Sequence, residues 1–382
     1  MSTWQIPLFD PDLDEREAMA VAEVVRSKWL TMGERTTSFE TRFAEYCGAS
    51  HAIAMSNCTA ALHLALHALG IGPGDEVIVP ALTFVASANA IRYCGARPVF
   101  ADVVSFDEWN IGPETIEPLI TPRTRAILVV HYAGYPCDMP AIMALAQQHG
   151  LAVVEDVAHA PGATLDGRAM GTWGDAGCFS FFSNKNMTTG EGGMVTTQKE
   201  PLAERLRRLR SHGMTTLTLD RHKGHAFSYD VVDLGFNYRM SELNAALGLC
   251  QLDRLPSGNA RRVEIVARYR AQLAGIPGLR VPFAQPRGIP VPHIMPVLLP
   301  AGTDRAAIMQ AMKAAGIQTS IHYRPVDTFT AYVEAGLGPA PHLNLTHEIG
   351  AATMTLPLYP GMTAEQIDYV CSTLLQALTR AG

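Results

Sequence analysis

Short, continuous apolar runs alternate with helix-like segments through the first part of the chain. The helical segment Thr59–Gly70 is apolar nearly all round, so it is expected to be buried. Met139–Gly150 is a second helical segment that separates two of the apolar runs. The apolar runs themselves, which we interpret as buried strands, are residues 76–80, 98–103, 126–132 and 151–156. Continuous apolar strands between helices are typical of a mainly parallel sheet with both faces covered, so the pattern predicts an α/β fold with ligands at the carboxyl edge.

The pattern changes past Met240. A long helical tract runs from Ser241 to about Leu273 and carries a candidate break at residues 256–258. The elements expected after it are an apolar run at 292–300, a helix at 304–316, a strand at 317–323 and a last helix at 363–380. These elements form a compact α+β unit. Because the chain has 382 residues, we expect a large domain over residues 1–250 and a smaller one over residues 251–382.

Composition and charge narrow the class of protein. The charged share of 17% is low against about 25% in an average domain, which favours a subunit interface. The net charge is −6, from 30 basic and 36 acidic residues, with no long run of either sign. A nucleic-acid surface needs clustered Lys and Arg, so the sequence predicts no nucleic-acid partner.

Cysteine and histidine usage predicts neither a disulfide framework nor a metal site. Seven cysteines occur without any C-x-x-C pair. His63 and His67 have the spacing of metal ligands on a helix, but Leu64 stands where a zinc protease has glutamate, so we expect core or interface histidines. The start of the chain lacks a signal-peptide pattern, and no apolar run approaches the roughly 20 residues that span a bilayer. We therefore expect a reduced, cytoplasmic protein with no membrane partner.

A single lysine, Lys185, lies between two apparently buried strands in the stretch "FSFFSNKNMTTGEGGMVTT". A buried lysine is costly unless it is used. A P-loop does not explain it, because Asn186 stands where Ser or Thr is required and no GxxxxGK precedes it. Two further segments add chemistry: "VVEDVAHAPGA" ends a buried strand with Asp156, and "SNCTAALHLAL" opens a buried helix whose start can bind an anion.

An anion-binding site, a buried carboxylate and a buried lysine are together the groups that bind pyridoxal 5′-phosphate (PLP). A desolvated lysine has a lowered pKa and attacks an aldehyde to give a Schiff base. A carboxylate facing the pyridine nitrogen makes the ring an electron sink. Singly, Asp156 could be only a helix cap and Phe84 only a core aromatic. In one α/β sheet they favour a PLP site in which Phe84 covers the ring.

Several segments carry a resemblance to a known family. They are "WLTMGERTTSFETRFAEYCGA", "GIGPGDEVIVPALTF", "VVEDVAHAPGA", "GDAGCFSFFSNKNMTTGEGGMVTT", "LGFNYRMSELNAALGLCQL" and "TLPLYPGMT". Over nearly its whole length the chain resembles the DegT/DnrJ/EryC1/StrS family of sugar aminotransferases, which are fold type I PLP enzymes. The resemblance implies a large domain with a mainly parallel mixed sheet between helices and a smaller C-terminal α+β domain.

The resemblance also implies roles for individual residues. Lys185 would be the Schiff-base lysine and Asp156 the partner of the pyridine nitrogen. Asn237 would reach the phosphate of the other subunit, which makes the site a property of a homodimer. The further implied cofactor contacts are Phe84 stacked on the ring, His159 at the ring hydroxyl, and Thr59, Ala60 and Ser180 at the phosphate. The implied substrate-side residues are His322 and Tyr323, with Arg239 serving either the site or only the interface.

The reaction implied is transamination from an amino donor, L-glutamate, to a keto sugar attached to a nucleoside diphosphate. Two departures from the family pattern matter. Cys58 stands where many members have glycine, so the turn before Thr59 must be of another kind. The stretch "VDTFTAY" after "HYRP" lacks the usual histidine, which leaves the acceptor open. A keto-cyclitol acceptor, a PLP-dependent sugar dehydratase and a non-catalytic regulator are the alternatives; Lys185 argues against the last two.

Overall fold

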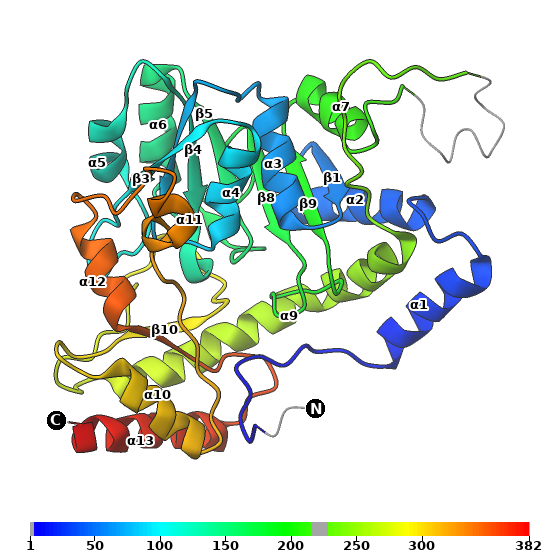
Figure 1. The fold of residues 1–382 in the computed structure, drawn as a ribbon. Helices are drawn as coiled ribbons and strands as arrows, with labels where there is room; N and C mark the ends of the chain where they lie inside the picture. The colour runs from blue at the N-terminus through cyan, green and yellow to red at the C-terminus, as the bar shows by residue number, and fades with distance from the viewer. Residues whose placement is uncertain (1–3, 216–227, 382) are drawn as a thin grey trace.

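A seven-stranded mixed sheet forms the centre of this computed structural model, which describes residues 4–215 and 228–381 (Figure 1). In spatial order the strands are β1 (His51–Met55), β9 (Gly193–Thr197), β8 (Ala176–Ser180), β5 (Ala152–Asp156), β4 (Thr124–Val130), β2 (Glu76–Pro80) and β3 (Arg97–Ala101). The pairs from β3 to β8 are parallel, and β9 is antiparallel to both of its neighbours. The predicted α/β fold with a mainly parallel mixed sheet is confirmed.

Helices cover both faces of this sheet, which explains why its strands are apolar at successive positions. Along β4, Leu128 and Val130 belong to one buried cluster, and Ile127 and Val129 belong to the other. The first cluster is closed by α3 (Cys58–Ala68), α4 (Val85–Tyr93) and α7 (Glu200–Leu209). The second is closed by α2 (Glu34–Cys47), α6 (Met139–His149) and the first half of α9 (Glu242–Leu273).

A third buried cluster lies in the C-terminal part of the chain. There β10 (Met295–Leu298) pairs antiparallel with β11 (Thr353–Leu356), and α10 (Arg305–Ala314) and α13 (Ala364–Ala381) pack around them with the second half of α9. The short elements are α5 (Pro113–Ile116), η1 (Glu117–Leu119), η2 (Tyr132–Gly134), β6 (Thr164–Leu165), β7 (Arg168–Ala169), η3 (Val326–Thr328), α11 (Thr330–Val333) and α12 (Asn344–Ala352). The division into domains 1–250 and 251–382 stays a prediction. Within the described residues, no helix is both long and apolar enough to cross a membrane.

Two predictions about this part of the chain are wrong. The helix α9 runs without a break through Pro256, which faces solvent while both halves of the helix pack against neighbouring helices. That packing offsets the cost of about 3 kcal/mol that an interior proline carries. The strand expected at 317–323 does not form. Ile317 bridges to Ile6 and Ser320 bridges to Thr355, so the segment changes partner after three residues and builds no continuous ladder.

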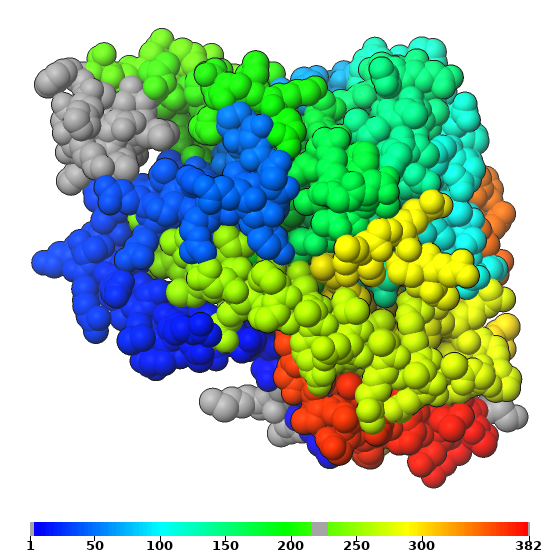
Figure 2. All heavy atoms as spheres, turned by 180° about the vertical axis from the view of Figure 1, so that it is seen from behind, coloured from blue at the N-terminus to red at the C-terminus, as the bar shows by residue number. Residues whose placement is uncertain are grey.

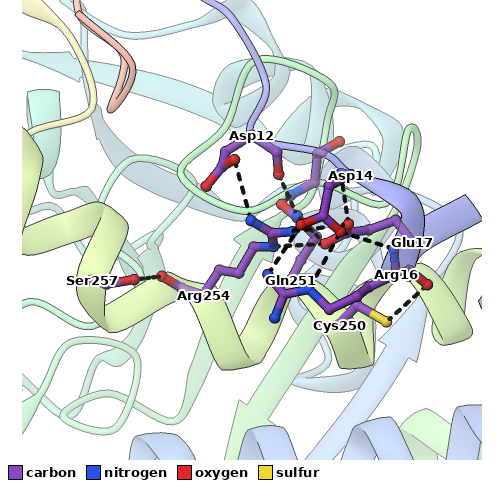
Figure 3. Close-up of polar contacts among 9 residues, drawn as sticks. Asp12, Asp14, Arg16, Glu17, Cys250, Gln251, Arg254 and Ser257 are labelled. Atoms are coloured by element: carbon purple, nitrogen blue, oxygen red, sulfur yellow. Dashed lines mark hydrogen bonds and ion pairs between the residues drawn. The ribbon is translucent and has the colours of Figure 1, made fainter.

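The N-terminal helix α1 (Glu15–Ser27) is attached to α9 by a polar cluster (Figure 3). Arg254 of α9 pairs with the carboxylates of Asp12, Asp14 and Glu17. Gln251, one turn earlier, donates to Glu17 Oε1 at 3.0 Å. Seen from behind, α9 crosses the molecule between the blue N-terminal helices and the red C-terminal helix (Figure 2).

A second link joins α9 to α2. Gly33 precedes α2 and has no side chain with which to cap it. The carboxylate of Glu242 takes this role, because it accepts hydrogen bonds of 2.8 Å from the backbone N–H groups of Gly33, Arg35 and Thr36. The start of α9 therefore satisfies the free amides at the start of α2.

Candidate active site

The ends of four sheet strands meet at one edge of the sheet. Strands β5 and β8 end there with Asp156 and Ser180, and β1 is followed there by the start of α3. Because β9 runs antiparallel to these strands, its first residue, Gly193, lies at the same edge. Lys185 is in the loop that joins β8 to β9. The topology thus gathers these residues at the edge where α/β proteins bind ligands.

A cavity of about 770 Å³ opens at this edge, within the range of about 300–1,000 Å³ that is usual for ligand sites. The predicted residues that line it are Thr59, Phe84, Asp156, His159, Ser180, Lys185, His322 and Tyr323. Three predicted residues, Ala60, Asn237 and Arg239, do not line it. One chain therefore brings most of the predicted site together.

The lysine is held in a setting that favours its neutral form. Its backbone N–H donates to the carbonyl of Phe182 at 2.9 Å, which fixes the loop. Burial lowers the pKa of Lys185 to about 8, against the opposing effect of Asp156 and Cys58. A lysine with this pKa presents a substantial fraction of nucleophilic amine near neutral pH.

Asp156 is buried and held by two donors. Ser87 Oγ donates to its Oδ2 at 2.8 Å, and the backbone N–H of Ala158 donates to its Oδ1 at 3.1 Å. Burial raises the pKa of Asp156, while these two hydrogen bonds and Lys185 oppose that rise. Ser87 in turn lies 3.0 Å from Thr83 Oγ1. Sequence reasoning missed both hydroxyls, because neither α4 nor the residues just before it carry a motif that marks them.

His159 is a neutral imidazole with a defined tautomer. Its Nδ1 accepts the backbone N–H of Ala133 at 3.2 Å, so its Nε2 carries the hydrogen and faces the hydroxyl of Tyr323 at 3.0 Å. Burial, with Lys185 and His322, holds the pKa of His159 well below its usual value. Both ring nitrogens thus have protein partners, and the predicted contact to the cofactor's ring hydroxyl stays a prediction.

The start of α3 provides the predicted anion-binding site. Asn57 caps the helix, and its Oδ1 accepts the N–H of Ala60 at 2.8 Å, so the Ala60 amide is already used. The N–H groups of Cys58 and Thr59 have no partner within the helix, as at any helix start. The helix begins at Cys58 after an extended Asn57, so this turn needs no glycine. A Cβ at Gly193 would lie 2.5 Å from the Asn57 carbonyl carbon, so only glycine lets β9 approach this turn.

Aromatic and histidine side chains form the outer wall of the cavity. Phe84 is 58% exposed, with its ring centre 6.1 Å from that of Tyr323, so it is not a core aromatic. His322 Nδ1 lies 2.9 Å from Thr355 Oγ1. Burial and the nearby Lys185 lower the pKa of His322 to about 4. His322 and Tyr323 therefore present neutral polar groups to a ligand.

The segment with Asn237 and Arg239 lies outside the cavity. Asn237 is exposed, and the next residue, Tyr238, accepts the backbone N–H of Ser56 at 2.8 Å. The segment is thus tied to the chain just before α3. The role of Asn237 at the site of a second subunit stays a prediction, as does the choice for Arg239 between site and interface.

One further residue that the sequence gave no reason to single out lies against the lysine. His293 Nε2 is 3.4 Å from Lys185 Nζ, and its Nδ1 is 3.0 Å from Asn186 Oδ1. His293 lies in the apolar run 292–300, which carries no motif that marks a functional residue. Its proximity to Lys185 depends on tertiary packing between distant parts of the chain.

The residues around the cavity fit PLP. A buried carboxylate and a lysine of lowered pKa face one cavity, and that cavity also contains the amide end of a helix and the hydroxyls of Thr59 and Ser180. This set of donors and acceptors complements a pyridine nitrogen, an aldehyde and a phosphate.

Comparisons with known proteins agree with a PLP site. The DegT/DnrJ/EryC1/StrS aminotransferase family matches residues 11–375. SpsC of Bacillus subtilis, a spore coat polysaccharide biosynthesis protein, is 43% identical over 371 residues, which cover 96% of this chain and 95% of SpsC.

Two solved structures share the fold. Spr1654 of Streptococcus pneumoniae in its PMP form is 31% identical with a TM-score of 0.93, covering 99% of this chain and 100% of that one. DesI, solved in the presence of its TDP-sugar product, is 33% identical with a TM-score of 0.88, covering 100% of this chain and 94% of that one. The predicted fold and the predicted cofactor, PLP, are thereby confirmed.

Proposed function

The chain belongs to the DegT/DnrJ/EryC1/StrS aminotransferase family and is a sugar aminotransferase, and we propose that its acceptor is a keto sugar carried on a nucleoside diphosphate. The presence of a TDP-sugar product in the DesI structure supports this substrate class. The amino donor in the proposal is L-glutamate. The donor and the acceptor react in turn at one site, so ping-pong kinetics follow.

The observation that supports the proposal most directly is that Lys185 and Asp156 line one cavity. When bound, PLP supplies a carbon that carries the amino group between substrates and a ring that accepts electrons. Lys185 is the residue to which we assign its covalent attachment. Once displaced, the Lys185 amine would take a proton from the substrate carbon that bears the amino group, and Nζ would then hold that proton for delivery to the cofactor carbon that receives the amino group. A pKa of about 8 suits an amine that must do both near neutral pH.

The other cavity residues bind and orient the ligands in this proposal. Asp156 faces the pyridine nitrogen, and Phe84 covers the ring. The amides of Cys58 and Thr59, with the hydroxyls of Thr59 and Ser180, hold the phosphate. His322 and Tyr323 line the substrate side, where their neutral side chains offer hydrogen bonds to sugar hydroxyls.

We further propose a homodimer in the cytoplasm. Asn237 is exposed beside the start of α3, which suits a residue that serves a partner subunit. All seven cysteines are free thiols, and free thiols are usual in a reducing compartment.

Replacement of Lys185 by alanine tests the proposal. The variant should lose glutamate-dependent amination of every keto sugar nucleotide in a panel, yet still bind pyridoxamine phosphate. The wild-type protein should be yellow and change its absorbance on addition of L-glutamate. Substantial transamination by Lys185→Ala would contradict the assignment. Amination of a keto-cyclitol alone would replace the nucleotide sugar with a free cyclic ketone.

A further inference from the structure

His293 is a hydrogen-bond partner of the Lys185 amine, with its Nε2 3.4 Å from Nζ. It is 5% exposed and does not line the 770 Å³ cavity. Its backbone is fixed on two sides. The N–H of His293 donates to the carbonyl of Ala133 at 2.8 Å, and its carbonyl accepts from Arg262 at 3.2 Å.

The tautomer of His293 follows from a chain of hydrogen bonds that ends at a backbone carbonyl. A carbonyl oxygen can only accept, so the group of Asn186 that faces the Val291 carbonyl at 3.2 Å is its NH₂. The same NH₂ donates to Asn259 Oδ1 at 2.9 Å, and Asn259 Nδ2 donates to the Pro161 carbonyl at 2.9 Å. Both amides are therefore fixed in orientation.

With its NH₂ so placed, Asn186 turns its Oδ1 toward His293 Nδ1 at 3.0 Å. This contact requires a hydrogen on Nδ1. In a neutral imidazole the other nitrogen, Nε2, then carries a lone pair. That lone pair faces Lys185 Nζ, so the lysine is the donor in this contact.

We propose that His293 is a positioning residue that accepts a hydrogen bond from Lys185 whenever the lysine is not bonded to the cofactor. In this arrangement one N–H of the free amine points to His293, and the lone pair of Nζ stays available to take a proton from the substrate. The inference rests on the proposed catalytic role of Lys185.

The surroundings of the pair keep His293 from taking a proton. Burial, and the neighbouring positive or ionisable groups, hold the pKa of His293 well below its usual value. His293 therefore stays neutral and does not take the proton from Lys185 itself. The ionisable groups around Lys185 are Asp156, Cys58, His159 and His322, and those around His293 are Lys185, His159, Arg262 and His322.

The backbone of Ala133 links this pair to the rest of the site. Ala133 has a left-handed φ of 56°, which is uncommon for a residue other than glycine. In this conformation its N–H donates to His159 and its carbonyl accepts from His293. Ala133 thus holds the ring of His159 and the backbone of His293, and the two imidazole rings lie 4.5 Å apart.

The tautomer is tested in the full-length protein with pyridoxamine phosphate bound, since Lys185 is then free. ¹⁵N NMR of histidine-labelled protein, with His293→Gln to assign the signals, should show a protonated Nδ1 and an unprotonated Nε2. An Nε2–H tautomer, or an imidazolium at neutral pH, would overturn the inference. This readout does not depend on turnover, so it separates failure of the inference from failure of the proposed function.

Two substitutions test the role of the acceptor. Glutamine places a side-chain oxygen near the position of Nε2, whereas asparagine is too short to reach Lys185. His293→Asn should lower the pKa of Lys185, measured by acetic anhydride labelling against pH, by about one unit. Its kcat should fall roughly ten-fold with little change in KM, whereas His293→Gln should stay within about three-fold of wild type.

A control shows that loss of a histidine elsewhere has no such effect. His342, which bonds the Phe100 carbonyl and does not line the cavity, is suited to a matched His→Gln change. His342→Gln should leave both the Lys185 pKa and kcat unchanged. Wild-type values of both quantities in His293→Asn would refute the positioning role, whatever its stability.

Discussion

Ser87 donates a hydrogen bond of 2.8 Å to the buried carboxylate of Asp156. The single hydroxyl hydrogen of Ser87 is used in this bond, so Thr83, 3.0 Å away, must donate to Ser87. Thr83, just before α4, thus donates to Ser87 in the first turn of α4, and Ser87 donates to Asp156 at the end of β5. The relay supports the ionised form of Asp156 against the effect of burial.

Removal of the Ser87 hydroxyl should therefore weaken cofactor binding. In Ser87→Ala the carboxylate loses one of its two donors, and the affinity for PLP should fall about ten-fold, as expected for a hydrogen bond to a charged group. Absorbance titration of the cofactor-free protein measures this. Thr83→Val, which removes only the outer hydroxyl, should give a smaller effect. Equal losses in both variants would show that the relay does not act through Asp156.

The pKa of Lys185 predicts how cofactor uptake depends on pH. Burial lowers that pKa from an ordinary 10.5 to about 8, and only the amine form attacks an aldehyde. Below pH 8 the lysine is mostly protonated, so the rate of PLP uptake should rise with pH. Above about pH 8 it should level off. Stopped-flow absorbance gives the rate. A rate that keeps rising toward pH 10.5 would indicate a lysine of ordinary pKa.

Gly193 sets the distance between β9 and the start of α3. In Gly193→Ala the new methyl group would meet the Asn57 backbone at 2.5 Å, so the turn must shift. The anion-binding site at the start of α3 moves with this turn. We therefore expect PLP affinity to fall ten-fold or more, which matches the usual energetic cost of overpacking a site. Gly72→Ala is the matched control, because a Cβ there meets nothing within 4 Å. Unchanged affinity in Gly193→Ala would remove the start of α3 from the phosphate site.

The sequence predicts the sheet well because both of its faces are buried. Each strand then becomes a continuous apolar run, and β2, β4 and β5 lie within a few residues of their predicted positions. Predictions fail where packing overrides the local signal. Pro256 suggests a break that the neighbours of α9 prevent, and segment 317–323 looks like a strand but has no single partner to pair with.

The candidate site likewise contains residues that the sequence predicts and residues whose position depends on packing. Lys185 and Asp156 could be predicted, because a lone lysine or carboxylate at the end of an apolar strand is itself a signal. The contacts of Ser87 and His293 could not, because each residue lies in a segment without a motif and reaches Asp156 or Lys185 through one hydrogen bond across a long sequence separation. Such contacts depend on how loops pack and leave no pattern in the sequence.

Glu242 should be important for stability, although it lies away from the cavity. In Glu242→Gln an NH₂ group would face at least one of the backbone N–H groups of α2 that the carboxylate now accepts. The free energy of unfolding should fall by about 2–3 kcal/mol, as for a buried donor left without its partner. Urea denaturation measures it. Glu348→Gln, at an exposed position of α12, should stay within about 0.5 kcal/mol of wild type. Equal stability of both variants would contradict the capping role.

Mixed dimers test the proposed role of Asn237 in the site of a partner subunit. In Asn237→Asp a negative charge would face the phosphate of the partner, so this variant should bind PLP poorly, and Lys185→Ala should be inactive. If Asn237 acts across the interface, a mixed dimer carries both lesions in one site and none in the other. Random mixing after co-expression should then restore about one quarter of the wild-type activity. Co-expression of Lys185→Ala with Asp156→Ala, two lesions of one cavity, should restore none. If Asn237 acts within its own chain, both mixtures should remain inactive.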